Sequence, residues 1–219
     1  MPDSIVTVSR AILLMTNEEK LCPSSTAVKF GLSERKHLPV VKVGRVSYPL
    51  WKFRYAKRIK NMIDALSLDE WAKAIIYSEL DQFEKYYLPP FSLKNKTVLD
   101  LGACCGESAY FYFQHGAKKV ICIEPDQTRA KLILKNKQNL NLNIELINDF
   151  FVPKHLLLEH DFIKCDIEGH EMQLIPYAKE LKPCIVETHG KKICEQFEKN
   201  GFHVVFRQKN GFFLMTNYS

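Results

Sequence analysis

The chain has 219 residues, of which 46% are hydrophobic and 26% charged. This composition is ordinary for a soluble globular protein, and the length suits one α/β domain with an extension or two small domains. Its apolar runs, such as 11–15, are far shorter than a bilayer span, which excludes a membrane-spanning helix and argues against a membrane partner. Seven cysteines without a CxxC pair indicate reduced thiols, so we expect a cytoplasmic protein.

The net charge of +6 is unevenly distributed, because the whole excess of Lys and Arg lies before Thr97. Between Glu34 and Asp64 there is no acidic residue, and aromatic residues are interleaved with basic ones. The basic residues of this segment, 35–60, are Arg35, Lys36, Lys42, Arg45, Lys52, Arg54, Lys57, Arg58 and Lys60. The pattern suits phosphate contacts and base stacking, which makes RNA one candidate partner. The alternative is a solvated helix face whose aromatic side chains point inward.

The N-terminal part is predicted to form an α+β extension. The apolar segment 4–15 has no clear period and fits either a strand or a short buried helix, and a turn is expected at 22–25. Two short strands are expected within 38–48, on either side of Gly44. Apolar residues recur at helical spacing over 51–66, which predicts a helix there.

A second helix is expected to begin at Ser67 and to run to about Tyr86. Ser67 followed three residues later by Glu70 is a capping-box pattern. The segment 88–96 contains two prolines, and we expect it to end this helix and to separate two domains. The predicted domains are 1–88, a basic extension that recognises the substrate, and 89–219, which carries the cofactor.

Beyond this boundary, strands and helices alternate regularly. Strands are expected at 98–101, 119–124, 144–147, 162–167, 184–187, 203–207 and 212–215. Helices are expected at 107–114, 126–140, 170–181 and 191–200, and a hairpin turn at 209–211. The alternation predicts an α/β fold: a doubly wound, mostly parallel sheet with helices on both faces and an antiparallel hairpin at the end. Ligands on such sheets bind at the carboxyl ends of the strands.

The first strand leads into a turn that indicates the ligand. Gly102 allows the backbone to turn tightly next to a ligand, and Gly106 opens a helix whose N-terminal amides face the site. The dinucleotide fingerprint has a glycine where this chain has Cys104, and the Asp100 carboxylate would repel a pyrophosphate but attract a cation. S-adenosylmethionine carries a sulfonium and an ammonium and no phosphate. Glu124 ends the next strand, where an acid accepts hydrogen bonds from ribose hydroxyls.

At these residues the chain resembles the class I S-adenosylmethionine-dependent methyltransferases. The segment Asp166-Ile-Glu168-Gly169-His-Glu171 resembles the D-x-E-G-x-E signature of the FkbM family. Other blocks similar to that family are Ile123-Glu124-Pro125, Asn136 or Asn139, and Ile185-Val-Glu187-Thr-His189. The resemblance covers roughly 79 to the C-terminus. The turn departs from the family pattern, which commonly has Asn at the position of Cys104.

The resemblance implies a Rossmann-like methyltransferase fold with a seven-stranded sheet and S-adenosylmethionine as cofactor. The expected cofactor-binding residues are Asp100, Gly102, Ala103, Gly106, Glu124, Pro125, Asp149 and Asp166. Methyl transfer to a hydroxyl needs orientation and a base that removes the acceptor's proton. The expected catalytic residues are Asp166, as first choice, and His170. The expected substrate contacts are Glu168, Glu187 and His189.

The acids and histidines at these strand ends are also residue types that bind divalent metals. Acids and histidines gather in metal-free substrate pockets as well, and we expect no metal here. The adjacent cysteines Cys104 and Cys105 are expected to pack as small apolar side chains.

The sequence therefore predicts an S-adenosylmethionine-dependent methyltransferase that acts on a hydroxyl of a small molecule or glycan. Methylation of tRNA or rRNA through 35–60 is the alternative. An NAD-binding oxidoreductase and a non-catalytic cofactor-binding protein are less favoured. The methyl acceptor and the oligomeric state stay open.

Overall fold

The computed structural model describes residues 28–32, 39–43, 46–49, 53–207 and 211–218. The chain divides into two compact units, an N-terminal unit, Met1–Ala65, and a C-terminal unit, Leu66–Ser219. The predictions for 4–15, 22–25, the turn at Gly44 and the residues 209–210 of the last hairpin turn lie outside the described residues.

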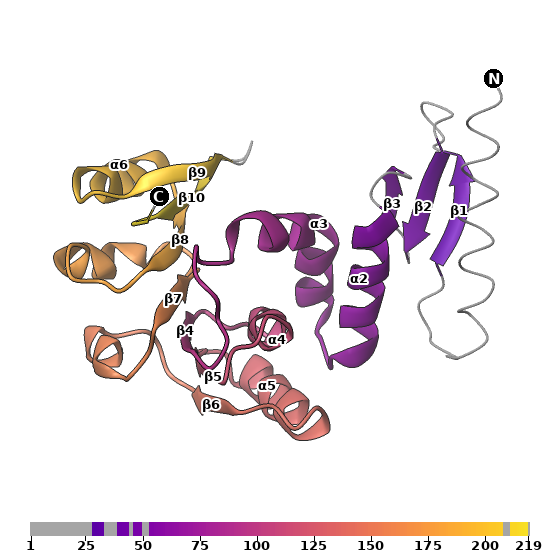
Figure 1. The fold of residues 1–219 in the computed structure, drawn as a ribbon, viewed down its shortest axis with the longest axis horizontal. Helices are drawn as coiled ribbons and strands as arrows, with labels where there is room; N and C mark the ends of the chain where they lie inside the picture. The colour runs from indigo at the N-terminus through magenta and orange to yellow at the C-terminus, as the bar shows by residue number, and fades with distance from the viewer. Residues whose placement is uncertain (1–27, 33–38, 44–45, 50–52, 208–210, 219) are drawn as a thin grey trace. The chain divides into compact units, whose positions relative to one another are not determined.

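The described part of the N-terminal unit forms a small antiparallel sheet and the helix α2 (Figure 1). The strands follow the order β1 (Val28–Leu32), β2 (Pro39–Val43) and β3 (Val46–Pro49), and the helix is α2 (Phe53–Ala65). The two strands expected around Gly44 and the helix after them are thus confirmed, while β1 was not expected. Ile59 and Met62 are buried, as the helical spacing predicted.

The C-terminal unit is built on one seven-stranded sheet with the order β6-β5-β4-β7-β8-β10-β9. In chain order the strands are β4 (Thr97–Leu101), β5 (Lys119–Ile123), β6 (Ile144–Ile147), β7 (Phe162–Cys165), β8 (Cys184–His189), β9 (His203–Arg207) and β10 (Phe212–Thr216). The first five pair in parallel, and β10 runs antiparallel to both β8 and β9. The predicted fold class, including the antiparallel hairpin, is confirmed.

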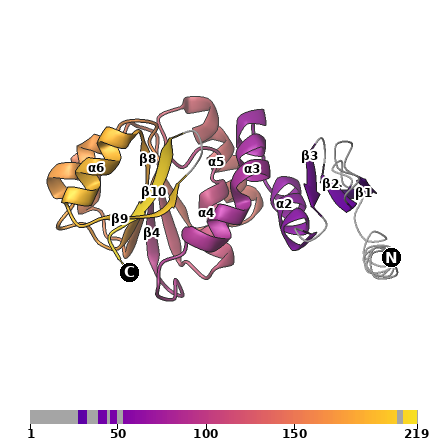
Figure 2. The same cartoon turned by 90° about the horizontal axis from the view of Figure 1, so that it is seen from above.

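Helices cover both faces of this sheet (Figures 1 and 2). In chain order they are α3 (Glu70–Tyr86), α4 (Glu107–Gln114), α5 (Gln127–Asn139), the 3-10 helices η3 (Pro153–Leu157) and η4 (Glu171–Tyr177), and α6 (Lys191–Lys199). The helices α3, α4 and α5 lie on one face, and η3, η4 and α6 lie on the other. The central strands are therefore buried on both sides: Leu99, Ile121 and Ile163 are at most 2% exposed. Each such side chain contributes about 2 kcal/mol to folding.

The helix α3 begins later than predicted. Asp69, not Ser67, caps it, because the Asp69 side chain accepts a hydrogen bond from the Ala72 amide at 2.7 Å. The backbone amide of Ser67 instead donates to Oδ1 of Asn136 on α5 at 2.6 Å. The two residues are 69 positions apart in the sequence, so no local pattern indicates this hydrogen bond.

The helix expected over 170–181 is a short 3-10 helix. Pro176 lies inside η4 and lacks the amide hydrogen that an α-helix requires at that position. The structure also divides the compact units after Ala65 rather than at the expected 88/89 boundary. The helix α3 belongs to the C-terminal unit because Phe83 packs against Phe111 of α4, with ring centroids 5.5 Å apart. Among the described residues, no helix combines the length and apolar character needed to cross a bilayer.

Candidate active site

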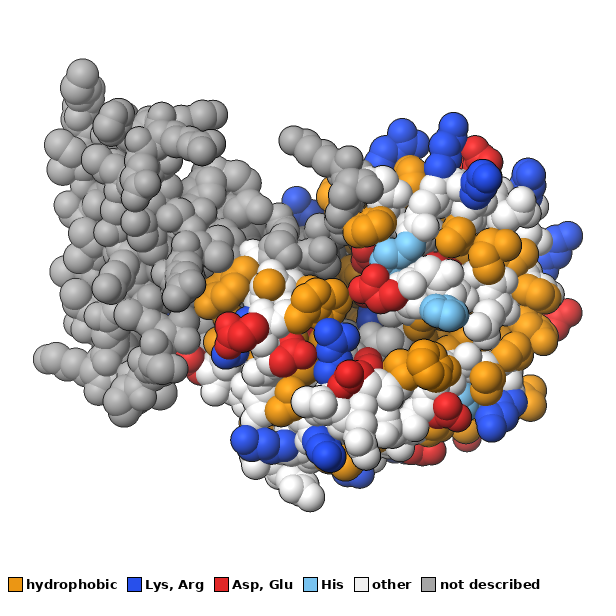
Figure 3. Space-filling model, turned by 180° about the vertical axis from the view of Figure 1, so that it is seen from behind, with side chains coloured by type: hydrophobic (Ala, Val, Ile, Leu, Met, Phe, Trp, Pro, Cys, Tyr) orange, Lys and Arg blue, Asp and Glu red, His pale blue; other side chains and the backbone are white. Residues whose placement is uncertain are grey.

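A cavity of about 240 Å³ lies at the carboxyl ends of β4, β5 and β7. This is the edge of the sheet where the sequence predicted the ligand, and acidic, basic and histidine side chains gather on that face of the C-terminal unit (Figure 3). The helix α3 adds an apolar wall through Trp71, Ile75 and Phe83, which sequence reasoning did not identify. No motif marks these side chains, since only the packing of α3 brings them to the cavity.

The cavity brings together half of the predicted site residues. Those that line it are Gly102, Glu124, Pro125, Asp166, Glu168 and His170. Those that do not line it are Asp100, Ala103, Gly106, Asp149, Glu187 and His189.

Position 102 requires a glycine, because the chain after β4 passes close to the backbone after β7. Its φ is +76°, and a Cβ added there would lie 1.8 Å from the backbone oxygen of Asp166. The amides of Gly102 and Ala103 both donate to the carbonyl of Ile123, at 3.0 and 3.2 Å. The turn is therefore held between β5 and β7. Ala103 is fully buried within it, and Gly106 caps α4 with φ +85°.

Glu124 faces the cavity with its carboxylate held in place by the backbone. Oε2 accepts from the Cys104 amide at 2.8 Å, and Oε1 accepts from the Asp126 amide at 2.9 Å. Each carboxylate oxygen can accept a further hydrogen bond, so the group suits a ligand with two neighbouring hydroxyls. Burial raises the pKa of Glu124.

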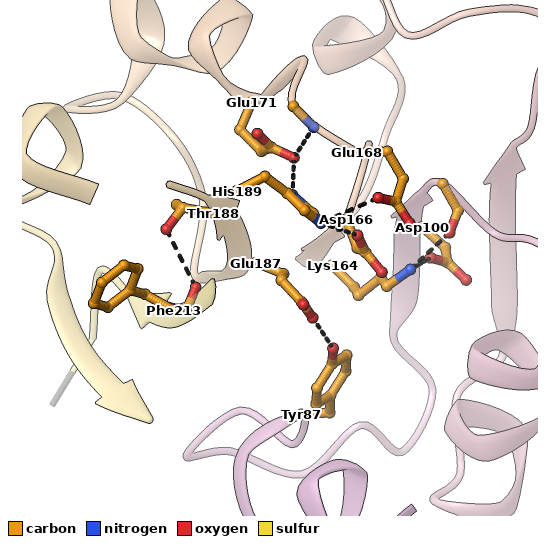
Figure 4. A network of polar contacts seen from close by, with 12 residues as sticks. Tyr87, Asp100, Lys164, Asp166, Glu168, Glu171, Glu187, Thr188, His189 and Phe213 are labelled. Carbon is orange, nitrogen blue, oxygen red and sulfur yellow. Dashed lines mark hydrogen bonds and ion pairs between the residues drawn. The ribbon is translucent and has the colours of Figure 1, made fainter. Parts of the chain in front are cut away.

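Asp100, predicted to place a carboxylate near the ligand, does not line the cavity and pairs with Lys164 instead. Its side chain is fully buried: Oδ1 lies 3.3 Å from Nζ of Lys164, and Oδ2 accepts from Oγ of Ser108 at 2.5 Å. Lys164 also donates to the carbonyl of Gly102 at 2.7 Å. Burial disfavours the charge on Lys164, but Asp100 and the neighbouring carboxylates raise its pKa well above the usual value. Asp100 and Lys164 therefore form a buried ion pair that supports the turn (Figure 4).

Carboxylates outnumber unpaired cations on the cavity wall. Glu107 lines the cavity, accepts from the Cys105 amide at 3.0 Å, and has its pKa raised to about 7 by burial. The two cations on the wall both have acidic partners. Lys164 has Asp100, and Arg129 has Asp69 with Nε 3.3 Å from its carboxylate. The wall thus favours a ligand with positive charge over a pyrophosphate.

Four side chains form an acid–histidine cluster beside the cavity: Asp166, Glu168, Glu171 and His189 (Figure 4). Nδ1 of His189 lies 2.7 Å from Oε1 of Glu171, which is fully buried. Nε2 of the same ring lies 3.3 Å from Glu168 and 3.8 Å from Asp166. Burial disfavours the charge on His189, but Glu171, Asp166 and Glu168 raise its pKa to about 9.

The D-x-E-G-x-E segment has a structural explanation in this cluster. Gly169 adopts φ +96°, and its amide donates to Glu171 at 2.8 Å, so Glu171 holds both the turn and His189. The link between Glu171 and His189 was not predicted from the sequence. Nothing near Glu171 in the sequence indicates a partner 18 residues away.

Two further predicted residues lie in other surroundings. Glu187 is buried and accepts from the hydroxyl of Tyr87 at 3.2 Å (Figure 4). Asp149 is exposed and accepts from the amide of Phe150, while Phe150 itself reaches the cavity.

No protein-family model and no curated protein sequence matches the chain. Its structure is similar to many solved structures. One is a precorrin-6Y C5,15-methyltransferase from Geobacter metallireducens, with 14% identity, a TM-score of 0.53, and coverage of 70% of this chain and 94% of that one. Another, from Clostridium thermocellum, is described as an rRNA methylase, with 16% identity, a TM-score of 0.50, and coverage of 63% and 93%. The chain therefore has a mixed α/β, seven-stranded, Rossmann-like fold, which it shares with these two structures.

Proposed function

We propose that the chain transfers a methyl group from S-adenosylmethionine to a hydroxyl of a small molecule or glycan. The observation that carries this proposal is a carboxylate-lined cavity at the strand ends of a methyltransferase fold, where Glu124 faces the space next to the Gly102 turn. The structural neighbours support methyl transfer at the level of the fold.

The described residues fit the cofactor group by group. Glu124 would accept hydrogen bonds from the ribose hydroxyls. One backbone amide holds each of its oxygens in place, and each oxygen keeps a second lone pair for the ligand. Pro125 and Phe150 offer apolar surface for the base. Asp166 offers negative charge to the sulfonium and ammonium ends, and Glu107 does so once it loses its proton above about pH 7.

S-adenosylmethionine would supply an activated methyl group: the acceptor oxygen bonds to the methyl carbon as the carbon–sulfur bond breaks, with its electron pair left on sulfur. The acceptor's proton needs a base on the protein. Asp166 is the first candidate, because it lines the cavity and its Oδ1 is buried without a hydrogen bond from the described residues. His170, which also lines the cavity, is the second. Glu168 would contact the acceptor.

We further propose that the chain is an FkbM-like methyltransferase. This proposal rests on the segment Asp166-Ile-Glu168-Gly169-His-Glu171 and on the resemblance stated above. The cytoplasmic location likewise stays a prediction.

RNA is the second candidate acceptor, favoured by the basic segment 35–60. Within its described part, Lys60 pairs with Asp64 at 2.6 Å. A mobility-shift titration with tRNA and rRNA fragments at several salt concentrations tests this alternative. Salt-sensitive binding that is lost when the segment's lysines and arginines are replaced would favour RNA.

Titration calorimetry with S-adenosylmethionine and with NAD tests the cofactor. We expect heat of binding with S-adenosylmethionine and none with NAD. Glu124→Gln should weaken the binding of S-adenosylmethionine about tenfold, because a charge-assisted hydrogen bond is replaced by a weaker one. Glu198→Gln, an exposed acid on α6, is the control and should bind like the wild type. Binding of NAD without S-adenosylmethionine would contradict the proposal and favour an oxidoreductase.

A further inference from the structure

The acid–histidine cluster holds one imidazole ring in a fixed orientation. The Glu171 side chain is fully buried, and its Oε1 accepts from both Nδ1 of His189 and the Gly169 amide. The His189 ring also packs against Phe212, with ring centroids 4.7 Å apart. Its second nitrogen, Nε2, is therefore directed at Asp166 and Glu168. A carboxylate on one ring nitrogen that directs the other is the usual outer-sphere arrangement of metal-binding histidines.

The cluster also carries an excess of negative charge. Three carboxylates converge on a single imidazole, and one proton on that ring cannot neutralise them. Lys164, the neighbouring cation, has Asp100 as its own partner. Oδ1 of Asp166 is buried and receives no hydrogen bond from the described part of the chain. This oxygen, 3.8 Å from Nε2 of His189, and the excess negative charge both suit a bound cation.

We propose that Asp166, Glu168 and His189 bind a divalent metal ion beside the cavity, with Glu171 positioning His189. One ligand atom from each of the three residues lies within 4.8 Å of the other two. Ligand atoms around one ion at about 2.1 Å lie roughly 3 to 4 Å apart, so small side-chain movements complete the site. The strand ends of β7 and β8 set the positions of Asp166 and His189, while Glu168 is exposed and adapts.

The ligand set identifies the class of metal. Two carboxylate oxygens favour Mg²⁺ or Mn²⁺, whereas an imidazole nitrogen favours a first-row transition-metal ion, and Mn²⁺ satisfies both preferences. Three protein ligands leave positions open for a ligand in the cavity, which Asp166 and Glu168 line. An acceptor oxygen bound there would have a lowered pKa and a fixed position. This role for the ion rests on the proposed function, and with Asp166 bound to the ion the proton would pass to His170, the second candidate base. Metal binding itself does not rest on the proposed function.

Manganese binding to the full chain is the test. The chain is freed of metal by a chelator and titrated with Mn²⁺, and the unbound ion is followed by electron paramagnetic resonance. We expect one Mn²⁺ per chain, with competition by Mg²⁺. Glu168→Gln keeps the shape of an exposed side chain but removes its charge, and should weaken binding at least tenfold. Glu180→Gln, an exposed acid outside the cluster, is the matched control and should bind like the wild type.

A spectroscopic readout tests the histidine. Pulsed electron paramagnetic resonance should detect nitrogen coupled to Mn²⁺ in the wild type and lose this coupling in His189→Gln. A folded wild type that binds none of Mn²⁺, Mg²⁺ and Zn²⁺, or equal Mn²⁺ affinity in the wild type and Glu168→Gln, would overturn the proposal. Calorimetry with S-adenosylmethionine on the metal-free chain separates the two proposals. A chain that binds the cofactor but no metal contradicts only the metal site. A chain that binds metal but not the cofactor contradicts only the proposed methyltransferase function.

Discussion

At the scale of single residues, the site depends on one glycine that no other residue can replace. A Cβ at Gly102 would lie 1.8 Å from the Asp166 carbonyl oxygen, and φ is +76°. We expect Gly102→Ala to cost about 3 kcal/mol or more and to abolish cofactor binding, because β4 and β7 must separate. Gly201→Ala is the control, since Gly201 has φ +90° with open space around it and should cost only about 1 kcal/mol. Urea unfolding measures both, and equal losses would contradict the steric explanation.

The buried ion pair beneath the turn makes a second prediction. Lys164→Met leaves the fully buried Asp100 without its cation and should cost about 3 to 5 kcal/mol. The double variant with Asp100→Asn should regain a large part of this loss, because the uncompensated charge is gone. Lys118→Met, at an exposed lysine, should change stability little. If the double variant is no more stable than Lys164→Met alone, the pair does not act as described.

Glu107 makes stability depend on pH. Burial raises its pKa in the folded chain to about 7, above the 4.5 of an unfolded glutamate. The folded state therefore holds a proton that the unfolded state has lost, so this contribution is full below about pH 4.5 and declines as pH rises through 7. Between pH 5 and 8 the wild type should lose about 2 kcal/mol relative to Glu107→Gln, which does not titrate. Denaturant unfolding of both proteins at several pH values measures this difference, and parallel curves would contradict it.

At the scale of elements, local patterns were enough wherever the partner of a residue is near in sequence. The bounds of α4 and β6 were predicted to the residue, and Asp126, where a helix was expected to begin, caps α5. Capping residues, glycines and apolar runs act within a few residues, so the sequence indicates them locally. The α-helix predicted after β7 is a 3-10 helix, because Pro176 cannot donate the backbone hydrogen bond that an α-helix requires there. Ser67 was predicted to cap α3, but its backbone amide donates to Asn136 on α5 instead. A partner so distant in the sequence leaves no local pattern.

Asn136 connects three elements of the C-terminal unit. Its buried amide accepts from the Ser67 amide and donates to the carbonyls of Ser67 and Cys105, which links α5 to the segment before α3 and to the turn after β4. We expect Asn136→Ala to cost about 3 kcal/mol, because three buried backbone groups lose their partner. Asn139→Ala, the same change at an exposed position of α5, should cost less than about 1 kcal/mol. Similar losses in urea unfolding would mean that the network contributes little.

At the scale of the whole molecule, the order of the strands decides which residues meet. Parallel strands end at one edge of the sheet, so Gly102, Glu124 and Asp166 were predicted together from sequence and do line one cavity. What each group does there depends on distant partners. Asp100 is neutralised by a lysine 64 residues away, and His189 is oriented by Glu171, neither of which a local motif indicates.

Substrate recognition by the N-terminal unit is a prediction that concerns both units of the chain. The basic segment 35–60 belongs to the unit Met1–Ala65, whereas the described cavity is lined by residues of Leu66–Ser219 alone. Substrate recognition by 1–88 therefore has to be tested on the full chain, with the RNA titration described above.

A crystal structure of the chain grown with saturating S-adenosylmethionine tests the central claim most directly. We predict that the ribose hydroxyls lie within hydrogen-bond distance of Glu124 and that the methyl group faces the side of the cavity formed by Asp166 and Glu168. A cavity without the cofactor at saturation, or a cofactor bound elsewhere on the chain, would contradict the account.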